Sequence, residues 1–232
     1  MYKKCFVAYL DILGFKSIVE DEDMDASTII DNLQQLNYLA GIHPKDDPKI
    51  HKIFMSDTLL WFSETDDEKS FKHIASLVAG TICFGIGFSI TNIEPLNFRG
   101  AISWGDFYYD NRENLFFCRA FNDASDWEKK QEWIGAVLTP ACAGFIQEQR
   151  FSVDTSLIVE YKAPIKEKVI SGNKCETIIK SQNCLCLNWT AQFGCKDVAP
   201  DLQVFKSNDD EVQRKLDNTY TFYTTLNPKS TI

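Results

Sequence analysis

The stretch Phe6-Val7-Ala8-Tyr9-Leu10-Asp11-Ile12-Leu13-Gly14-Phe15 decides the fold. An apolar run of strand length ends on one carboxylate, and a glycine-containing turn and a helical segment follow. A carboxylate at the end of a buried strand is costly unless a metal ion, a cluster of amides or a cation compensates its charge. Most aspartates in such a place are turn residues or helix caps, so the meaning of Asp11 depends on a second carboxylate.

The second carboxylate is Asp57. Residues 50–62 are rich in Ile, Phe, Leu and Trp and read as two strands joined by a tight turn at Ser56-Asp57. If the first strand lies beside this hairpin, Asp11 and Asp57 meet. Carboxylate oxygens suit Mg2+ and Mn2+, and two such ions can clamp the attacking and leaving oxygens of a phosphoryl transfer. The pair therefore predicts a two-metal site, and two turn-forming aspartates are the alternative.

Composition limits the classes of partner. The net charge is -9 and no cluster of Lys and Arg occurs, which argues against a nucleic-acid strand but not against a nucleotide held through metal ions. The eight cysteines include no C-x-x-C pair, so they indicate neither a zinc ribbon nor a thioredoxin-type site. Without a signal-peptide pattern or a long apolar span, we expect reduced cysteines, a cytoplasmic location and no membrane span.

Hydrophobic periodicity gives the order of elements. The expected strands cover residues 4–11, 50–62 (two strands), 98–109, 115–118, 137–138, 153–161 and 184–189. The expected helices are 16–20, a segment capped by Ser27, 71–88, 120–133, one that starts at Thr139-Pro140, and a polar one after Asp209. The Lys-, Gly- and Asn-rich stretch between the last two strands is expected to be a loop. This order predicts one layered α+β domain with a mixed sheet and helices on one face.

Four motifs resemble those of class III nucleotidyl cyclases. Asp11-Ile12-Leu13-Gly14-Phe15 is similar to their D-I-x-G-F motif, and Ser56-Asp57 to their G-D turn. Residues 99–105 resemble the R-x-G-I-x-x-G strand, and residues 121–125 resemble V-N-x-A-S. The resemblance covers roughly residues 4–145, with the motifs in the family's order.

The resemblance implies a class III cyclase-like fold: a ferredoxin-like core with a mixed or antiparallel sheet covered by helices, and a C-terminal extension. We expect a catalytic domain at 1–205 and a polar C-terminal helix and tail at 206–232. The resemblance also implies a homodimer with composite sites. Asp11, Asp57 and the Ile12 carbonyl would hold two divalent ions, Mn2+ or Mg2+. Asn122 of the other subunit would orient the ribose, and Phe15 would lie at the nucleotide. The 3'-hydroxyl would then attack the α-phosphate and expel pyrophosphate.

Departures from the family's motifs narrow the substrate. Ile53 and Leu115 stand where the family has its purine-selecting Lys and Asp, and apolar groups cannot supply the hydrogen bonds that read a purine edge. Asp126 replaces the transition-state Arg, and Lys130 one turn later is our candidate for that role.

The motif Asn-Asp-Ala-Ser-x-Trp-Glu-Lys resembles that of the pyrimidine cyclases of the Pycsar antiphage system, which make cyclic UMP or cyclic CMP. That likeness implies UTP as substrate, with CTP open, in a pocket narrowed by His51, Ile53 and Arg99. Lys162 and Lys166 are the candidates for holding the triphosphate.

Plainer interpretations remain open for several of these residues. Arg99 could form an ordinary salt bridge at a strand edge, and Asn122 could be a helix N-cap. The whole chain could also be a degenerate cyclase-fold protein that binds a nucleotide or a partner without turnover, because Asp126 cannot stabilise a developing phosphate charge.

Overall fold

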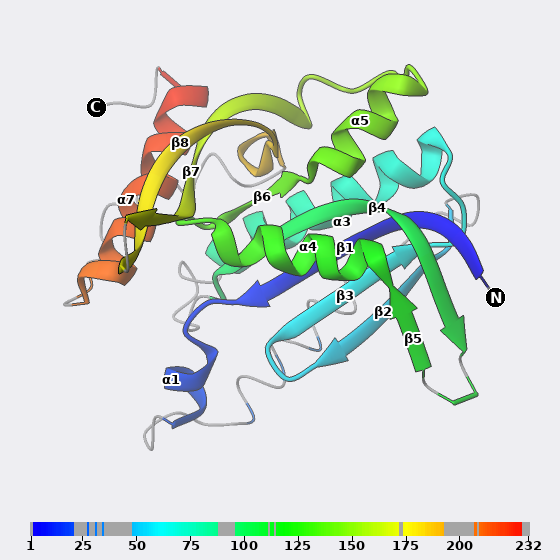
Figure 1. Cartoon of the computed structure of the whole chain (residues 1–232), viewed down its shortest axis with the longest axis horizontal. Helices are drawn as coiled ribbons and strands as arrows, with labels where there is room; N and C mark the ends of the chain where they lie inside the picture. Colours follow the sequence, from blue (N-terminus) through cyan, green and yellow to red (C-terminus); the bar gives the residue numbers. More distant parts are fainter. Residues whose placement is uncertain are drawn as a thin grey trace.

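The computed structural model describes residues 2–20, 27, 31, 34, 48–87, 96–110, 112–113, 115–171, 174–192, 207 and 209–228. The helix expected after Ser27 falls almost entirely outside these residues. The remaining elements form a single sheet with helices packed against it (Figure 1).

The sheet has eight strands in the order β2-β3-β1-β4-β6-β8-β7, with β5 paired to the end of β4. Only the β4–β6 pair is parallel, so the sheet is mixed as expected. The strands are β1 (Tyr2–Ile12), β2 (Ile50–Met55), β3 (Thr58–Ser63), β4 (Phe98–Asp110), β5 (Leu115–Cys118), β6 (Gly135–Leu138), β7 (Ile158–Ser171) and β8 (Lys174–Leu187).

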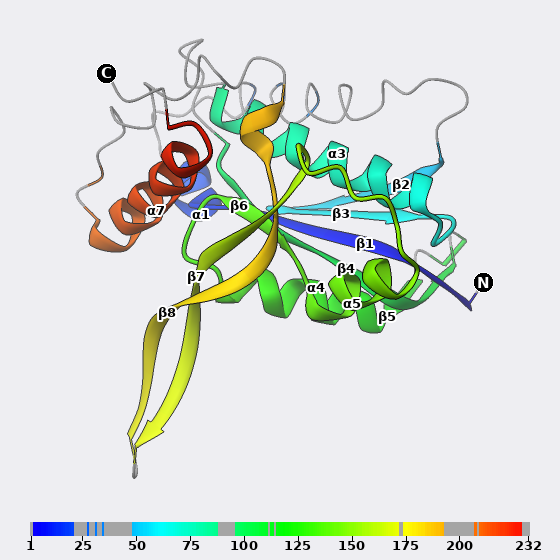
Figure 2. The same ribbon diagram turned by 90° about the horizontal axis from the view of Figure 1, so that it is seen from above.

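Helices cover both faces of the sheet, not one. Figure 2 shows α3 above the sheet and α4 below it. The central strand β1 is buried at every position from Cys5 to Leu10, which is the pattern of a strand covered on both sides and explains its continuous apolar run. The described helices are α1 (Phe15–Glu20), α3 (Glu68–Gly87), α4 (Arg119–Lys130), α5 (Pro140–Glu148), the 3-10 turn η2 (Trp189–Ala191) and α7 (Asp210–Leu226).

Helix α3 is the main core helix. By length and composition it could cross a membrane, yet 61% of its apolar window is buried inside the fold. Gly85 allows the helix to approach the next segment closely, because a Cβ there would lie 2.1 Å from the carbonyl oxygen of Leu96. The expectation that the chain has no membrane span stays a prediction.

The stretch expected to be a loop between the last two strands is instead a long β-hairpin. Strands β7 and β8 pair without interruption from Ile158↔Leu187 to Ser171↔Lys174. We call residues 158–187 the arm, and Figure 2 shows that its outer part projects from the body on the α4 side of the sheet. The error has a physical cause: a solvent-exposed ribbon carries charged residues on both faces, so it lacks the apolar alternation that marks a strand.

The C-terminal helix α7 is part of the core. Asp209 caps it, accepting hydrogen bonds from the backbone N–H groups of Glu211 and Val212, so a helix begins where the sequence predicted one. Its inner face is apolar, however, and the Phe222 ring packs on Trp133 at 4.6 Å and on Tyr161 at 4.8 Å between ring centroids. The description of 206–232 as a polar extension therefore understates its packing.

Cysteine chemistry departs from the sequence expectation at one position. Six described cysteines are free thiols, five of them buried. Cys83 forms a disulfide whose partner is not among the described residues. The expectation of eight reduced cysteines is therefore wrong for Cys83.

Candidate active site

The structure brings Asp11 and Asp57 to the same end of the sheet. Strands β1 and β3 pair with Asp11 opposite Thr58, and the Ile12 N–H donates to the Asp57 carbonyl oxygen at 2.9 Å. Ser56 adopts φ 55°, a left-handed conformation that tightens the β2–β3 turn and leaves Asp57 at its tip. The arrangement proposed from sequence, in which the first strand lies beside the hairpin, is the one observed.

The electrostatics of Asp11 fit a divalent cation. Burial, the Glu128 carboxylate and the Asp57 carboxylate together raise the pKa of Asp11 to about 7, against the opposing effects of Arg99 and Lys129. Excess negative charge held in a partly buried place is what a bound cation relieves. No group of three or more His, Cys, Asp or Glu able to hold a metal occurs among the described residues. Asp11 and Asp57 would therefore hold the ions with backbone oxygen, water and substrate oxygens.

Arg99 serves a different purpose from the predicted one. It is 8% exposed and lies opposite Asp11 in the sheet. Its guanidinium contacts Glu128 Oε1 through Nε at 2.6 Å and Nη2 at 2.5 Å, and Nη1 donates to the Gln131 carbonyl at 2.8 Å. Every nitrogen of the fork is thus occupied within the chain, and Arg99 ties helix α4 to β4. The open alternative of a salt bridge is the one observed, although it is buried instead of at an edge.

Asn122 is not a helix cap. The N-cap of α4 is Cys118, whose sulfur accepts a hydrogen bond from the Phe121 N–H at 3.0 Å. Asn122 lies within the helix and is exposed, and Asp126 lies one turn further on, also exposed. Both side chains thus remain available to a molecule outside this chain, which is compatible with a role at a partner subunit's site.

A basic groove runs between α4 and the arm. Its volume is about 1050 Å³. Six lysines and two acidic residues line it, so it carries net positive charge in a chain whose overall charge is -9. The charged lining residues are Asp126, Lys129, Lys130, Lys162, Lys166, Glu167, Lys168 and Lys180.

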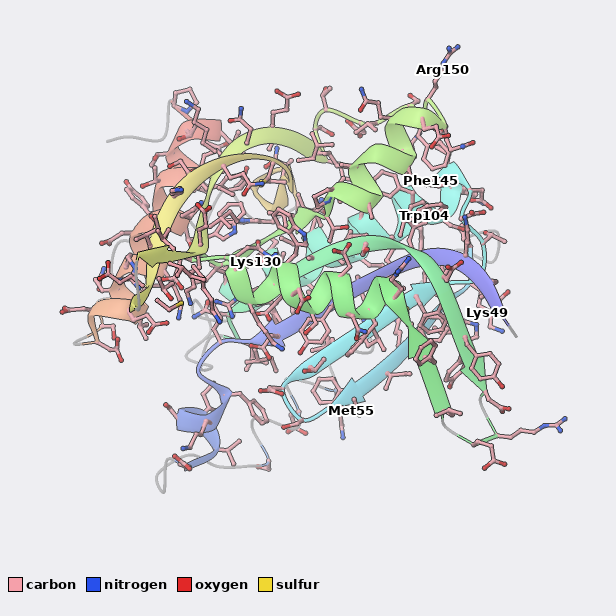
Figure 3. All side chains as sticks on the ribbon, viewed as in Figure 1. Lys49, Met55, Trp104, Lys130, Phe145 and Arg150 are labelled. Carbon is pink, nitrogen blue, oxygen red and sulfur yellow. The ribbon has the colours of Figure 1, made fainter. Side chains whose placement is uncertain are left out.

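The three lysines predicted from sequence all line this groove, but they differ in their partners. Lys130, at the end of α4 (Figure 3), lies over the Trp127 ring at 5.0 Å. Lys166 is ion-paired with Glu132, a fully buried carboxylate, so its charge is already used within the chain. Lys162 is exposed and makes no ion pair within the described part of the chain. Of the two triphosphate candidates, Lys162 is therefore the better one.

The expected base-selecting residues separate. Ile53 and His51 face the α4 side of the sheet, and His51 stacks on Phe62 at 4.9 Å between ring centroids and hydrogen-bonds Glu64 at 2.9 Å. Leu115 pairs with Asp110 of β4. The β4 residues that share the face of Ile53 are the odd-numbered ones, so Asp110 and Leu115 lie on the other face.

Leu115 therefore points to the face opposite to that of Ile53, so the two expected base-selecting positions do not share a surface of one chain, and the nucleotide role of Leu115 stays a prediction. Tyr109 lies on the face of Ile53 and packs against the same cluster of buried side chains. Tyr109 could not be recognised from its neighbours in the chain, because its face follows from the pairing of β4 with β1.

Phe15 begins α1 directly after the turn that follows Asp11 and Ile12, and its ring is partly buried against the core. Gly14, with φ +76°, allows the turn that places it there. Phe15 is thus close in sequence to Asp11 but is held by the core, so its nucleotide role stays a prediction.

Comparison with solved structures identifies the architecture. No family model matches the chain, and no curated protein matches it. The catalytic core of a rhodopsin-guanylyl cyclase with converted specificity, in complex with ATPalphaS, superposes with a TM-score of 0.53 at 12% identity, covering 79% of this chain and 99% of that one. A bacterial light-regulated adenylyl cyclase gives a TM-score of 0.52 at 10% identity, covering 85% of this chain and 56% of that one. The chain has the class III nucleotidyl cyclase fold.

Within this cyclase fold, the candidate residues of one chain form two groups. The carboxylates Asp11 and Asp57 lie at the end of β1 and the β2–β3 turn, and neither lines the basic groove. Lys130 and Lys162 line that groove together with Asp126. The carboxylates nevertheless lie near the groove, because Lys129, one of its lining residues, acts on the pKa of Asp11.

Proposed function

We propose that this protein is a pyrimidine nucleotide cyclase that converts UTP into 3',5'-cyclic UMP and pyrophosphate. The observation that carries the proposal is the meeting of Asp11 and Asp57 at one end of a cyclase-fold sheet, where the pKa of Asp11 is raised to about 7. A pair of carboxylates that burial and mutual repulsion leave uncompensated fits divalent cations such as Mn2+ or Mg2+. The likeness to Pycsar cyclases extends the proposal to signalling in antiphage defence.

The proposed reaction is an in-line displacement. The 3'-oxygen of the nucleotide forms a bond to the α-phosphorus, the bond from that phosphorus to the bridging oxygen of the β-phosphate breaks, and the 3'-hydroxyl proton is released. Bound cations would supply charge neutralisation of the phosphate oxygens and a lower pKa of the 3'-hydroxyl. The protein contributes positioning: Asp11 and Asp57 hold the reacting end, Asn122 orients the ribose, and Lys162 and Lys130 bind the phosphates to be expelled.

A homodimer with composite sites accords with the resemblance to class III cyclases and with the position of Asp11 and Asp57, which do not line the basic groove themselves. A twofold dimer that places the groove of one copy against the acidic end of the other would complete two equivalent sites. The exposure of Asn122 is compatible with this arrangement.

The choice of a pyrimidine rests on the side chains at and around Ile53. An apolar side chain leaves a purine edge without a partner, and a lost hydrogen bond to a buried polar group costs about 1–3 kcal/mol. The His51 ring, stacked on Phe62 and hydrogen-bonded to Glu64, occupies space on the same face. Both features favour a smaller base, and neither distinguishes UTP from CTP, so a cytidylate cyclase is the nearest alternative.

The test is incubation of the purified protein with Mn2+ and each of the four ribonucleoside triphosphates. Chromatography and mass spectrometry would identify the cyclic product, and a coupled assay would quantify pyrophosphate. Cyclic UMP with an equal amount of pyrophosphate is the expected result. Turnover of CTP alone would establish the alternative substrate, turnover of ATP alone would exclude the pyrimidine assignment, and no product from any nucleotide would exclude the enzyme.

A second candidate function follows from Asp126. This carboxylate lines the basic groove at the position where the family has its transition-state Arg. Its negative charge lowers the affinity of the groove for phosphate. A protein of this kind could bind a nucleotide, or a partner, without turning it over. Equilibrium binding of a non-hydrolysable UTP analogue together with absent turnover would favour this function over the enzyme.

A further inference from the structure

The outer arm, residues 166–171 and 174–179, is a two-stranded ribbon whose described side chains are largely exposed. It extends away from the rest of the molecule on the α4 side (Figure 2). A two-stranded hairpin by itself is only marginally stable in water, and it gains stability when one of its faces packs against another surface. The outer arm therefore has the form of an element that packs against a partner.

One face of the outer arm carries exposed apolar side chains. Ile170 is 77% exposed and Ile179 is 40% exposed. Because directly paired residues of an antiparallel ladder point to the same side, the pairs Ile170↔Cys175 and Lys166↔Ile179 place both isoleucines on one face. Lys166 and Lys168 share this isoleucine face, so it presents exposed apolar groups next to cationic ones.

The charge of the arm is opposite to that of the body. Residues 158–187 contain five lysines and three glutamates, a net charge of +2, so the other residues of the chain carry -11. Such a distribution disfavours contact of the arm with another cation-rich surface and favours an acidic partner surface. A second copy of this chain offers one.

The arm also forms one wall of the basic groove. Lys162, Lys168 and Lys180 of the arm face Lys129 and Lys130 of α4 across it. If the acidic end of a second copy seats at this groove, its body must lie alongside the arm. We propose that the outer arm packs through Ile170 and Ile179 on a second copy of the chain and strengthens the dimer.

This proposal rests on the proposed function only for the position of the partner copy. Its test measures self-association and does not use turnover. The first variant shortens the arm: residues 168–177 are replaced by Asn-Gly, which can link the paired residues Glu167 and Ile178 as a two-residue hairpin turn. Sedimentation equilibrium of the whole chain is expected to show a dimer dissociation constant raised by about tenfold or more relative to wild type.

Point variants keep the proposal testable if the shortened arm misfolds. Ile170→Asp with Ile179→Asp places charge on the isoleucine face and is expected to weaken the dimer to a similar extent. Glu176→Gln, an exposed change on the other face of the same arm, is the matched control and is expected to leave the dissociation constant unchanged. Far-UV circular dichroism checks that each variant is folded.

The outcomes separate the two proposals. A wild-type monomer at all concentrations, or an unchanged dissociation constant in folded arm variants, would overturn the arm interface. A weakened dimer in the arm variants of a protein that cyclises no nucleotide would support the interface and overturn the enzyme. Equal weakening by Glu176→Gln would show that the effect is not specific to the isoleucine face, and would also overturn the proposal.

Discussion

At the scale of single residues, the unfavourable burial of the Asp11 carboxylate is also what suits it to bind a metal ion. Burial, together with Glu128 and Asp57, raises the pKa of its carboxyl group to about 7, so without a cation a large part of the population is protonated near neutral pH. A divalent ion would replace that proton. Metal binding and proton release at this residue should therefore be linked.

The first prediction concerns the pH dependence of metal binding. Because a proton must leave Asp11 before the carboxylate can hold a cation, Mn2+ affinity is expected to fall as the pH drops below about 7, by up to about tenfold per pH unit. Titration calorimetry in buffers of different ionisation enthalpy measures both the affinity and the protons released. An affinity independent of pH would contradict the assignment.

The second prediction concerns the stability of the metal-free protein. The folded-state pKa of Asp11 lies above its ordinary value of 3.8, so its contribution to stability is present below that value and is lost as the pH rises through about 7. Asp11→Asn removes this loss. Its melting temperature is expected to exceed that of the wild type at high pH, and the difference should shrink in acid.

The third prediction is that Asp57→Ala abolishes turnover and leaves the dimer intact. Loss of one carboxylate from a two-metal site is expected to lower kcat by at least about 10²–10³-fold. Glu148→Gln, an exposed change at the end of α5, serves as the control. Unchanged turnover in Asp57→Ala would refute the metal assignment.

At the scale of elements, a buried ion pair holds α4 in place. Arg99 connects β4 to Glu128 and to the Gln131 carbonyl, and the Gln131 side-chain amide donates to the Gly100 carbonyl at 2.7 Å. The helix that carries Asn122, Asp126 and Lys130 is thereby fixed relative to the strand that carries Asp11. Sequence motifs alone assigned Arg99 to the nucleotide because they could not show that Glu128 reaches it.

The fourth prediction tests this attachment of α4. Arg99→Met leaves Glu128 buried without its partner and is expected to lower the free energy of unfolding by about 3–5 kcal/mol. Arg99→Met with Glu128→Met removes both charges and should recover most of that loss. Urea denaturation measures both variants. Full stability of the single variant would show that the pair does not hold the helix.

Helix α7 provides a second case at this scale. Arg214 contacts the buried Glu132, Asn218 donates to the Glu132 carbonyl, and Thr219 accepts from the Ile134 N–H. Together with Phe222, these contacts make the helix a structural part of the domain. The sequence did not indicate this role, because several of the polar residues that make α7 look exposed form hydrogen bonds to the core side.

The fifth prediction follows from that packing. Phe222→Ala is expected to lower the free energy of unfolding by about 3–5 kcal/mol, since it empties the space between Trp133 and Tyr161. Thr221→Ala, on the exposed side of the same helix, should change it by less than about 0.5 kcal/mol. A similar small effect in both would show that α7 is a dispensable extension.

At the scale of the whole molecule, the carboxylates Asp11 and Asp57 lie near the basic groove but do not line it, and Asn122 on α4 is exposed. The proposed function divides the site between two chains, with the carboxylates from one and Asn122 from the other. If the proposed function is correct, the assembly and not the single chain is the unit that performs the reaction.

The sixth prediction uses this division. Asp57→Ala and Asn122→Ala are each expected to be inactive as homodimers, because one lacks the metal group and the other the ribose group. After random mixing, half of the dimers carry one unaltered site, so activity should return to about a quarter of the wild-type value. Gel filtration verifies subunit exchange. An inactive mixture in which exchange has occurred would contradict composite sites.

The sequence by itself determined which residues form the central strand, the hairpin turn, the cap at Thr139 and the start of a helix after Asp209, because these depend on local patterns of apolar, turn and capping residues. It also indicated Asp11 and Asp57, since a carboxylate at a buried strand end stands out in the apolar run around it. Its motif order predicted the fold that the comparison with solved structures shows.

Only the tertiary structure decided the roles that depend on long-range partners. It placed Arg99 on Glu128, Lys166 on Glu132 and Leu115 on the face away from Ile53, and it formed a groove from α4 and the arm. The physical reason is that the role of a charged side chain depends on which distant residue forms an ion pair with it. The direction of a strand side chain likewise depends on the register of strand pairing. Neither the partner nor the register can be read from neighbours in the chain.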